Sequence, residues 1–135
     1  MAARILDGKS LAAEIRAAVK TRVAAFSQRG IRPGLAVILA GDDPASAVYV
    51  RHKTLACEET GVHSRVIKLD RSATHERVLD EVHALNADRA VHGILVQLPL
   101  PRHVDGARVL AAVSPAKDVE GFQATTLGGL VTLAP

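Results

Sequence analysis

Aromatic side chains are nearly absent from this chain of 135 residues, which contains no tryptophan, one tyrosine and two phenylalanines. Surfaces that stack nucleic-acid bases depend on aromatic rings, and the 17 Lys and Arg residues form no continuous basic run. Their excess over the 14 Asp and Glu residues is small. We therefore expect no nucleic-acid partner, although the mildly basic balance suits a small acidic ligand.

Cysteine and long hydrophobic runs are also scarce. Cys57 is the single cysteine, so no disulfide can form within the chain and no Cys-x-x-Cys zinc site exists. The six histidines show no metal-ligand spacing, and we expect no metal. No apolar run reaches the roughly 18 residues of a membrane span, and the first eight residues lack the apolar segment of a secretory signal. We expect a cytoplasmic protein with no membrane partner.

Aliphatic residues make up most of what is present. Hydrophobic residues account for 48% of the chain and charged residues for 23%, which is typical of one soluble domain with an aliphatic core. A chain of this length can bury about two-thirds of its unfolded surface. We expect a single domain and no room for a two-domain enzyme.

Apolar spacing predicts alternating helices and strands. Helices are expected over residues 10–30, with Ser10 as N-cap, over 45–60 with Gly61 after its end, after the capping residues 72–74, and over 106–113. Strands are expected over 35–40, 62–69 and 93–98, and no element is assigned to 117–135. Because the first strand is apolar throughout and the third is apolar apart from Gln97, both should be buried on both faces.

This order predicts an α/β fold, a three-layer αβα domain with a mainly parallel sheet. Ligands of such sheets bind at the carboxyl ends of the strands. The loops Gly41–Pro44 and Leu98–Pro101 should therefore lie along one rim. The second strand is less apolar and should lie at an edge.

Tyr49 and Lys53 stand four residues apart and share one face of the second predicted helix. They are either a solvated lysine lying on a half-buried tyrosine, or a catalytic pair. Lysines partly removed from water exchange protons near neutrality, and a tyrosine ring can stack on a flat ligand. Gln97 is the one polar side chain in the third predicted strand, and its amide must bond either nearby backbone or a ligand.

Two acids and one thiol complete the candidates. Asp118 and Glu120 lie in a loop before Gly121, where they are either solvated acids or acceptors for an amino-substituted heterocycle. Cys57 lies on the apolar side of its helix and is interpreted as a small core residue. No Gly-x-Gly-x-x-Gly turn for a dinucleotide pyrophosphate occurs.

Three separated segments carry a more specific pattern. They are GDDPAS, YVRHK and ACEETG within residues 41–61, LNAD and GILVQLPLP within 85–101, and KDVEGF at 117–122; residues 5–9, ILDGK, add an opening match. Together they resemble the bifunctional methylenetetrahydrofolate dehydrogenase/methenyltetrahydrofolate cyclohydrolase family. The resemblance is to the amino-terminal catalytic domain, over residues 1–122, and residues 123–135 are expected to begin a connection to a second, NADP-binding Rossmann domain that this chain lacks.

The resemblance implies site roles residue by residue. Lys53 would be the catalytic lysine with Gln97 as its hydrogen-bonded partner, and Tyr49 would stack on the folate rings. Leu98 and Pro99 would contact the substrate, and Glu120 would anchor the pterin. The family usually has aspartate at the position of Glu120, and a His-Pro pair where Gln123 and Ala124 follow Phe122.

The family interconverts 5,10-methylene-, 5,10-methenyl- and 10-formyltetrahydrofolate in one-carbon metabolism, which feeds purine biosynthesis, with NADP as hydride acceptor and commonly as a homodimer. We expect the folate half of this chemistry here, without NADP-dependent oxidation by the chain alone. The alternative is a truncated, non-catalytic folate- or partner-binding module.

Overall fold

Three parallel strands form the centre of the protein, which a computed structural model describes for residues 7–132. The elements in chain order are α1 (Gly8–Gln28), β1 (Gly34–Ala40), α2 (Pro44–Thr60), β2 (His63–Leu69), α3 (His75–Ala87), β3 (Gly93–Val96), α4 (Gly106–Ala112), a 3-10 turn (Pro115–Lys117) and α5 (Ala124–Thr132). Residues 1–6, which hold part of the ILDGK match, and residues 133–135, the end of the expected connection, lie outside the described residues.

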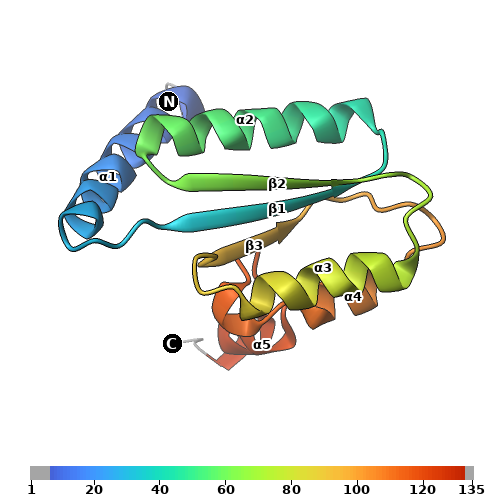
Figure 1. The fold of residues 1–135 in the computed structure, drawn as a ribbon. Helices are drawn as coiled ribbons and strands as arrows, with labels where there is room; N and C mark the ends of the chain where they lie inside the picture. The colour runs from blue at the N-terminus through green and yellow to red at the C-terminus, as the bar shows by residue number, and fades with distance from the viewer. Residues whose placement is uncertain (1–6, 133–135) are drawn as a thin grey trace, which may run out of the picture.

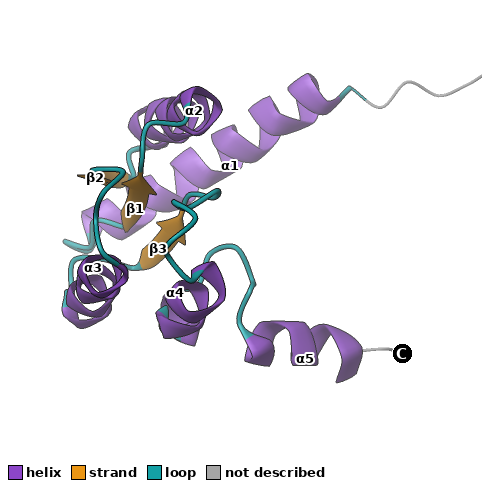
Figure 2. Cartoon of the chain, turned by 90° about the vertical axis from the view of Figure 1, so that its right-hand side faces the viewer, coloured by secondary structure: helices purple, strands orange, loops and turns teal. Residues whose placement is uncertain are grey.

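The strands lie in the order β2-β1-β3, and both pairings are parallel. In Figure 1, α2 runs along one side of the sheet and α3 and α4 along the other, and the rotated view in Figure 2 shows the same layers. α1 packs against α2, and an Arg16–Glu59 ion pair at 3.0 Å links them. The predicted three-layer α/β fold is confirmed, with β2 at an edge as expected.

Side chains of β1 alternate between two cores. Ala36 and Ile38 face α3 and α4, where Val78, Val82 and Leu85 of α3 are buried as predicted. Val37 and Leu39 face α2 and meet its Val50 and Leu95 of β3 in a second core. The uninterrupted apolar sequence of β1 therefore serves two faces, as burial in a parallel sheet requires.

The first helix differs from the prediction in its start and in what its apolar stripe contacts. Its N-cap is Asp7, not Ser10, because the Asp7 carboxylate accepts the backbone amides of Lys9 and Ser10. Leu11 and Ile15 are exposed, and Val23 is the buried residue of this helix. Apolar spacing identifies a face of a helix without showing what covers it.

The carboxyl-terminal part differs in two further places. The third strand ends at Val96 rather than residue 98. The Gln97 amide still bonds Ile38 of β1, but Pro99 has no N–H with which to continue the pairing. The segment assigned no element forms the 3-10 turn and α5. Two glycines in α5 lower its helix propensity, so the sequence did not predict this helix.

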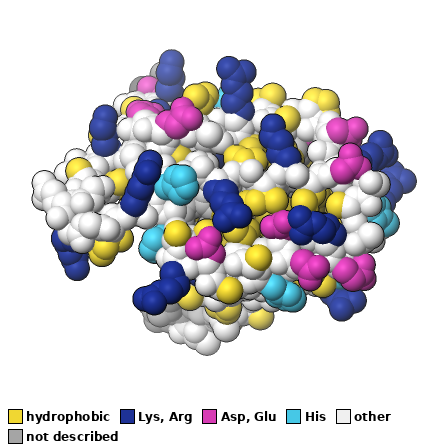
Figure 3. Space-filling view, viewed as in Figure 1, with side chains coloured by type: hydrophobic (Ala, Val, Ile, Leu, Met, Phe, Trp, Pro, Cys, Tyr) yellow, Lys and Arg dark blue, Asp and Glu magenta, His cyan; other side chains and the backbone are white. Residues whose placement is uncertain are grey.

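None of the helices within residues 7–132 is both long and apolar enough to span a membrane. On the face of the molecule drawn in Figure 3, Lys and Arg side chains are interspersed with Asp and Glu rather than gathered in one patch.

Gly34 offers a test of how tightly β1 meets the turn before β3. A Cβ at this position would overlap the carbonyl oxygen of Ala90, and the backbone of Gly34 is already bonded to His92 on both sides. We expect Gly34→Ala to lower the free energy of unfolding by about 2 kcal/mol, the range for overpacking a fixed backbone contact.

The measurement is urea denaturation followed by circular dichroism. Gly8→Ala is the control, because nothing lies within 4 Å of a Cβ there and alanine favours a helix by up to about 1 kcal/mol. Equal midpoints for the two variants would contradict the close contact.

Candidate functional site

Lys53 and Gln97 meet at the carboxyl end of β3. The Lys53 Nζ donates to Gln97 Oε1 at 2.8 Å, and Gln97 Nε2 donates to the carbonyl of Leu98 at 2.8 Å. The backbone amide of Gln97 still donates to Ile38 of β1, at 2.9 Å. Gln97 therefore bonds both nearby backbone and the lysine, and its amide oxygen fixes the ammonium group at the end of the sheet.

Hydrogen bonds at the start of α2 anchor the helix that carries Lys53. Asp43 caps the helix by accepting the amide of Ser46 at 2.7 Å, and Pro44 occupies its first turn. The buried Ser46 hydroxyl donates to the carbonyl of Leu98 at 3.3 Å. Ser46 thus ties α2 to the segment after β3. Sequence reasoning did not single it out, although it lies seven residues before Lys53 and hence on the same helix face.

Tyr49 is one turn before Lys53 on α2, and 62% of it is exposed. It is not the half-buried platform for a lysine stem that one interpretation of the sequence required. Leu98 is exposed as well, at 40%. An exposed ring and an exposed aliphatic side chain thus lie on the two segments that carry Lys53 and Gln97.

Glu120 brings a carboxylate within electrostatic reach of this pair. Partial burial raises the pKa of the Glu120 carboxyl above its ordinary value, the Lys53 ammonium acts in the opposite direction, and the Asp118 carboxylate raises it further. Lys53 thus has a hydrogen-bond partner in Gln97 and an electrostatic partner in Glu120. Glu120 is exposed, so both interpretations of this acid, solvated or bound to a ligand, stay open.

The two loops expected along one rim do lie together. They line an open cavity of about 630 Å³ between residues 40–44 and 99–103, to which Arg71, just after β2, also contributes. Pro99 belongs to this lining, whereas Lys53, Gln97 and Glu120 do not. The cavity and the lysine site therefore share the segment after β3 without being one pocket.

Cys57 is buried on the inner side of α2, and burial raises the pKa of its thiol, as a core residue requires. Among residues 7–132, no three His, Cys, Asp or Glu side chains converge on a position for a metal ion.

These features define a class. They are those of a parallel three-layer α/β domain, a fold in which small ligands generally bind where the strands end. The chain belongs to the family described as "Tetrahydrofolate dehydrogenase/cyclohydrolase, catalytic domain", whose model matches residues 6–120.

Known proteins support this membership. The chain is 53% identical over 131 residues to the bifunctional protein FolD of Acidovorax sp. strain JS42, covering 97% of this chain and 46% of that protein. It matches the crystal structure of the FolD dehydrogenase/cyclohydrolase from Campylobacter jejuni with a TM-score of 0.94 and 44% identity, over 96% of this chain and 46% of the other.

A third relative was solved with ligands. The Trypanosoma brucei N5,N10-methylenetetrahydrofolate dehydrogenase-cyclohydrolase, complexed with NADP cofactor and inhibitor, matches with a TM-score of 0.91 and 35% identity, over 95% of this chain and 44% of that one. The chain spans about half the length of the relatives it matches.

The coupling of Glu120 to Lys53 can be tested in the free protein. Lys53→Met removes the charge that lowers the pKa of Glu120, so the pKa of Glu120 should rise further when its carboxyl carbon is titrated by NMR. Because the folded-state pKa is raised, the stability that Glu120 contributes is present at low pH and is lost as pH rises through that pKa. Lys68→Met, on the exposed side of β2, is the matched control. An unchanged titration in Lys53→Met would show that the two groups do not interact.

Proposed function

We propose that the chain is the folate-binding catalytic domain of a methylenetetrahydrofolate dehydrogenase/methenyltetrahydrofolate cyclohydrolase, and that the reaction its own residues serve is hydrolysis of the methenyl bridge. The observation that carries the proposal is the 2.8 Å bond from Lys53 Nζ to Gln97 Oε1 at the end of β3, with the Glu120 carboxylate in electrostatic reach.

Hydrolysis of the bridge is a proton-transfer problem. Water adds to the amidinium-like carbon of the methenyl group, loses a proton, and the ring opens to the 10-formyl product as the leaving nitrogen gains one. Lys53 Nζ in its neutral form accepts the proton from water and in its charged form returns one to the nitrogen. Gln97 keeps the amine directed at the reacting carbon, since its own amide is fixed by Leu98.

The remaining candidates bind the substrate. The exposed Tyr49 ring stacks on the flat rings of the folate. Glu120 accepts hydrogen bonds from the amino group and ring N–H of the pterin. Leu98 and Pro99 supply the apolar edge between these groups.

Hydride transfer needs a nicotinamide cofactor, and neither the start of α2 nor the exit of β3 fits its pyrophosphate. A pyrophosphate binds where backbone amides at a helix start are free. The start of α2 is capped instead by the Asp43 carboxylate, which repels phosphate, and the exit of β3 contains Pro99 and Pro101, which have no N–H. We therefore expect no NADP-dependent oxidation by this chain alone.

Wider expectations rest on the family resemblance. Residues 1–122 form the catalytic domain, and residues 123–135 begin the connection toward an NADP-binding part. The full enzyme acts as a cytoplasmic homodimer in the one-carbon metabolism that supplies purine biosynthesis.

A non-catalytic folate- or partner-binding module is the second candidate. It is favoured by Gln123, which stands where the family has histidine. The Gln123 side chain is buried, and its Nε2 donates to the carbonyls of Leu110 and Val113. A side chain used in this way is unavailable to substrate.

Replacing Lys53 tests the first proposal. We expect slow hydrolysis of 5,10-methenyltetrahydrofolate by the chain, and a further loss of about 100-fold or more in Lys53→Ala, the usual contribution of a positioned acid-base group. Absorbance of the methenyl compound follows the reaction. Lys68→Ala controls for the loss of one positive charge.

Calorimetric titration with 5-formyltetrahydrofolate separates the alternatives. Equal hydrolysis by the chain and by Lys53→Ala refutes the role of Lys53. Binding without turnover supports the non-catalytic module, and absence of binding removes both.

A further inference from the structure

The loop of residues 117–123 is organised around one carboxylate that the proposed chemistry does not use. Asp118 Oδ1 accepts the backbone amides of Glu120 at 3.1 Å and Gly121 at 3.0 Å, and Oδ2 accepts the amide of Gln123 at 2.9 Å. Hydrogen bonds to an ionised acceptor are stronger than those between neutral groups. Three of them close the backbone around Glu120.

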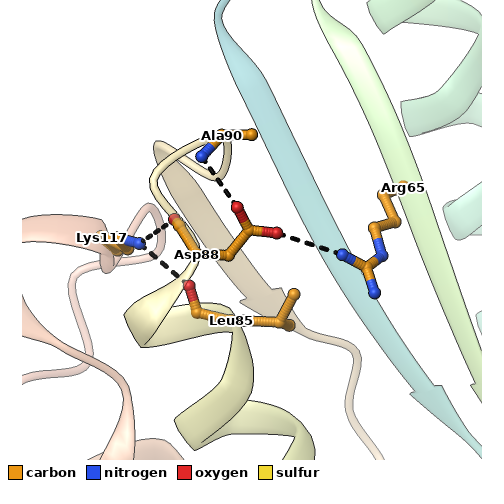
Figure 4. Close-up of polar contacts among 5 residues, drawn as sticks. All are labelled: Arg65, Leu85, Asp88, Ala90 and Lys117. Atoms are coloured by element: carbon orange, nitrogen blue, oxygen red, sulfur yellow. Dashed lines mark hydrogen bonds and ion pairs between the residues drawn. The ribbon is translucent and has the colours of Figure 1, made fainter.

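The same loop is anchored at its start on two elements. Asp118 forms a parallel bridge with Ile94 of β3. Lys117 Nζ donates to the carbonyls of Leu85 and Asp88 at the end of α3, at 2.9 and 2.7 Å. Figure 4 shows this ammonium group between the two carbonyl oxygens, with the Asp88 carboxylate turned away toward Ala90 and Arg65. The lysine thereby satisfies carbonyls that a helix end leaves free.

The end of the loop is anchored on α4. The Nε2 of the buried Gln123 donates to Leu110 at 2.6 Å and to Val113 at 2.7 Å, and its backbone carbonyl accepts the amides of Thr126 and Leu127 at the start of α5. With both ends fixed, the position of Glu120 depends on how the Asp118 carboxylate folds the backbone between them.

Both parts of the proposed site are therefore attached to one strand, β3. Gln97 follows β3 directly and holds Lys53, whereas Asp118 bridges to β3 at Ile94 and holds the backbone of Glu120. We propose that Asp118 is a positioning residue, which fixes the Glu120 carboxylate relative to Lys53 so that a reduced folate meets a preformed pair of groups. The inference rests on the folate-binding function proposed above.

Preorganisation matters because a ligand that must first order a loop loses affinity. The Glu120 side chain is one methylene longer than the aspartate usual in the family. A fixed backbone leaves only the side-chain torsions to accommodate this extra length. Asp118 thereby determines whether the substitution at 120 is tolerated.

Two variants of Asp118 separate its contributions. Asp118→Ala removes all three acceptor bonds. Asp118→Asn keeps one carboxamide oxygen for the amides of Glu120 and Gly121 and places an N–H₂ group against the amide of Gln123. Asp105→Ala is the matched control, since Asp105 also accepts a backbone amide, that of Arg108 at 3.1 Å, but caps the far end of α4.

The experiment measures the dissociation constant of 5-formyltetrahydrofolate by calorimetry for the 135-residue chain and its variants. We expect Asp118→Ala to weaken binding about tenfold or more, the equivalent of one lost charged hydrogen bond. Asp118→Asn should fall between Asp118→Ala and the unchanged chain, and Asp105→Ala should bind within about twofold of it, because its loss is one of stability alone.

Amide spectra of the free chain give a second readout that needs no ligand. The Glu120 and Gly121 amide resonances should move strongly in Asp118→Ala, less in Asp118→Asn, and not in Asp105→Ala. Unchanged affinity in Asp118→Ala, or a loss matched by Asp105→Ala, overturns the inference and leaves the folate function standing. If the unchanged chain does not bind, the folate function fails, and the amide resonances still decide whether Asp118 positions Glu120. If Asp118→Ala does not fold, Asp118→Asn replaces it in both the binding and the amide measurement.

Discussion

The sheet is parallel and covered on both faces, and the arrangement of the whole domain follows from this constraint. Ala36, Val37 and Ile38 of β1 are completely buried, and their partners on β3 are at most 6% exposed. Polar groups placed along such strands would pay a desolvation penalty. They gather instead where the strands end, and there Ser46 and Lys53 of α2 meet Leu98 and Gln97 after β3.

Each polar group at this end of the sheet is held by a partner from another element. Ser46 and Gln97 both bond the carbonyl of Leu98, which joins α2 to the exit of β3. Lys53 donates to the Gln97 amide and is in electrostatic reach of the Glu120 carboxylate. An ammonium with a neutral acceptor and a carboxylate in reach suits a ligand that must be bound and also exchange protons.

Sequence reasoning succeeded where one local pattern decided the outcome. Val78, Val82 and Leu85 were found from helical spacing, and Gly61 adopts the left-handed conformation expected after α2, with φ of 83°. Pairing of Lys53 with Gln97 was expected from the family resemblance; from the residues alone, each was a candidate with two interpretations. The choice between them depends on the crossover from β1 to β2, which brings Lys53 of α2 to Gln97 after β3.

Two features could not be predicted from the sequence, each for a physical reason. Asp118 was indistinguishable from a solvated loop acid, because its three bonds go to backbone amides that leave no side-chain pattern. The exposed half of α1 carries the spacing of a buried stripe, so Leu11 and Ile15 suggested a contact that the described residues do not make. The spacing of apolar residues shows which face of a helix is apolar, but not which element packs against that face.

Chemical-shift mapping tests the central claim most directly, namely that a reduced folate is bound where Lys53, Gln97 and Glu120 meet. Amide spectra of the chain would be recorded while 5-formyltetrahydrofolate is added. The largest changes should fall on Tyr49, Lys53, Gln97 and Glu120, with little change at Arg71 and Arg102 beside the neighbouring cavity. Changes confined to that cavity, or none at saturating ligand, would contradict the site.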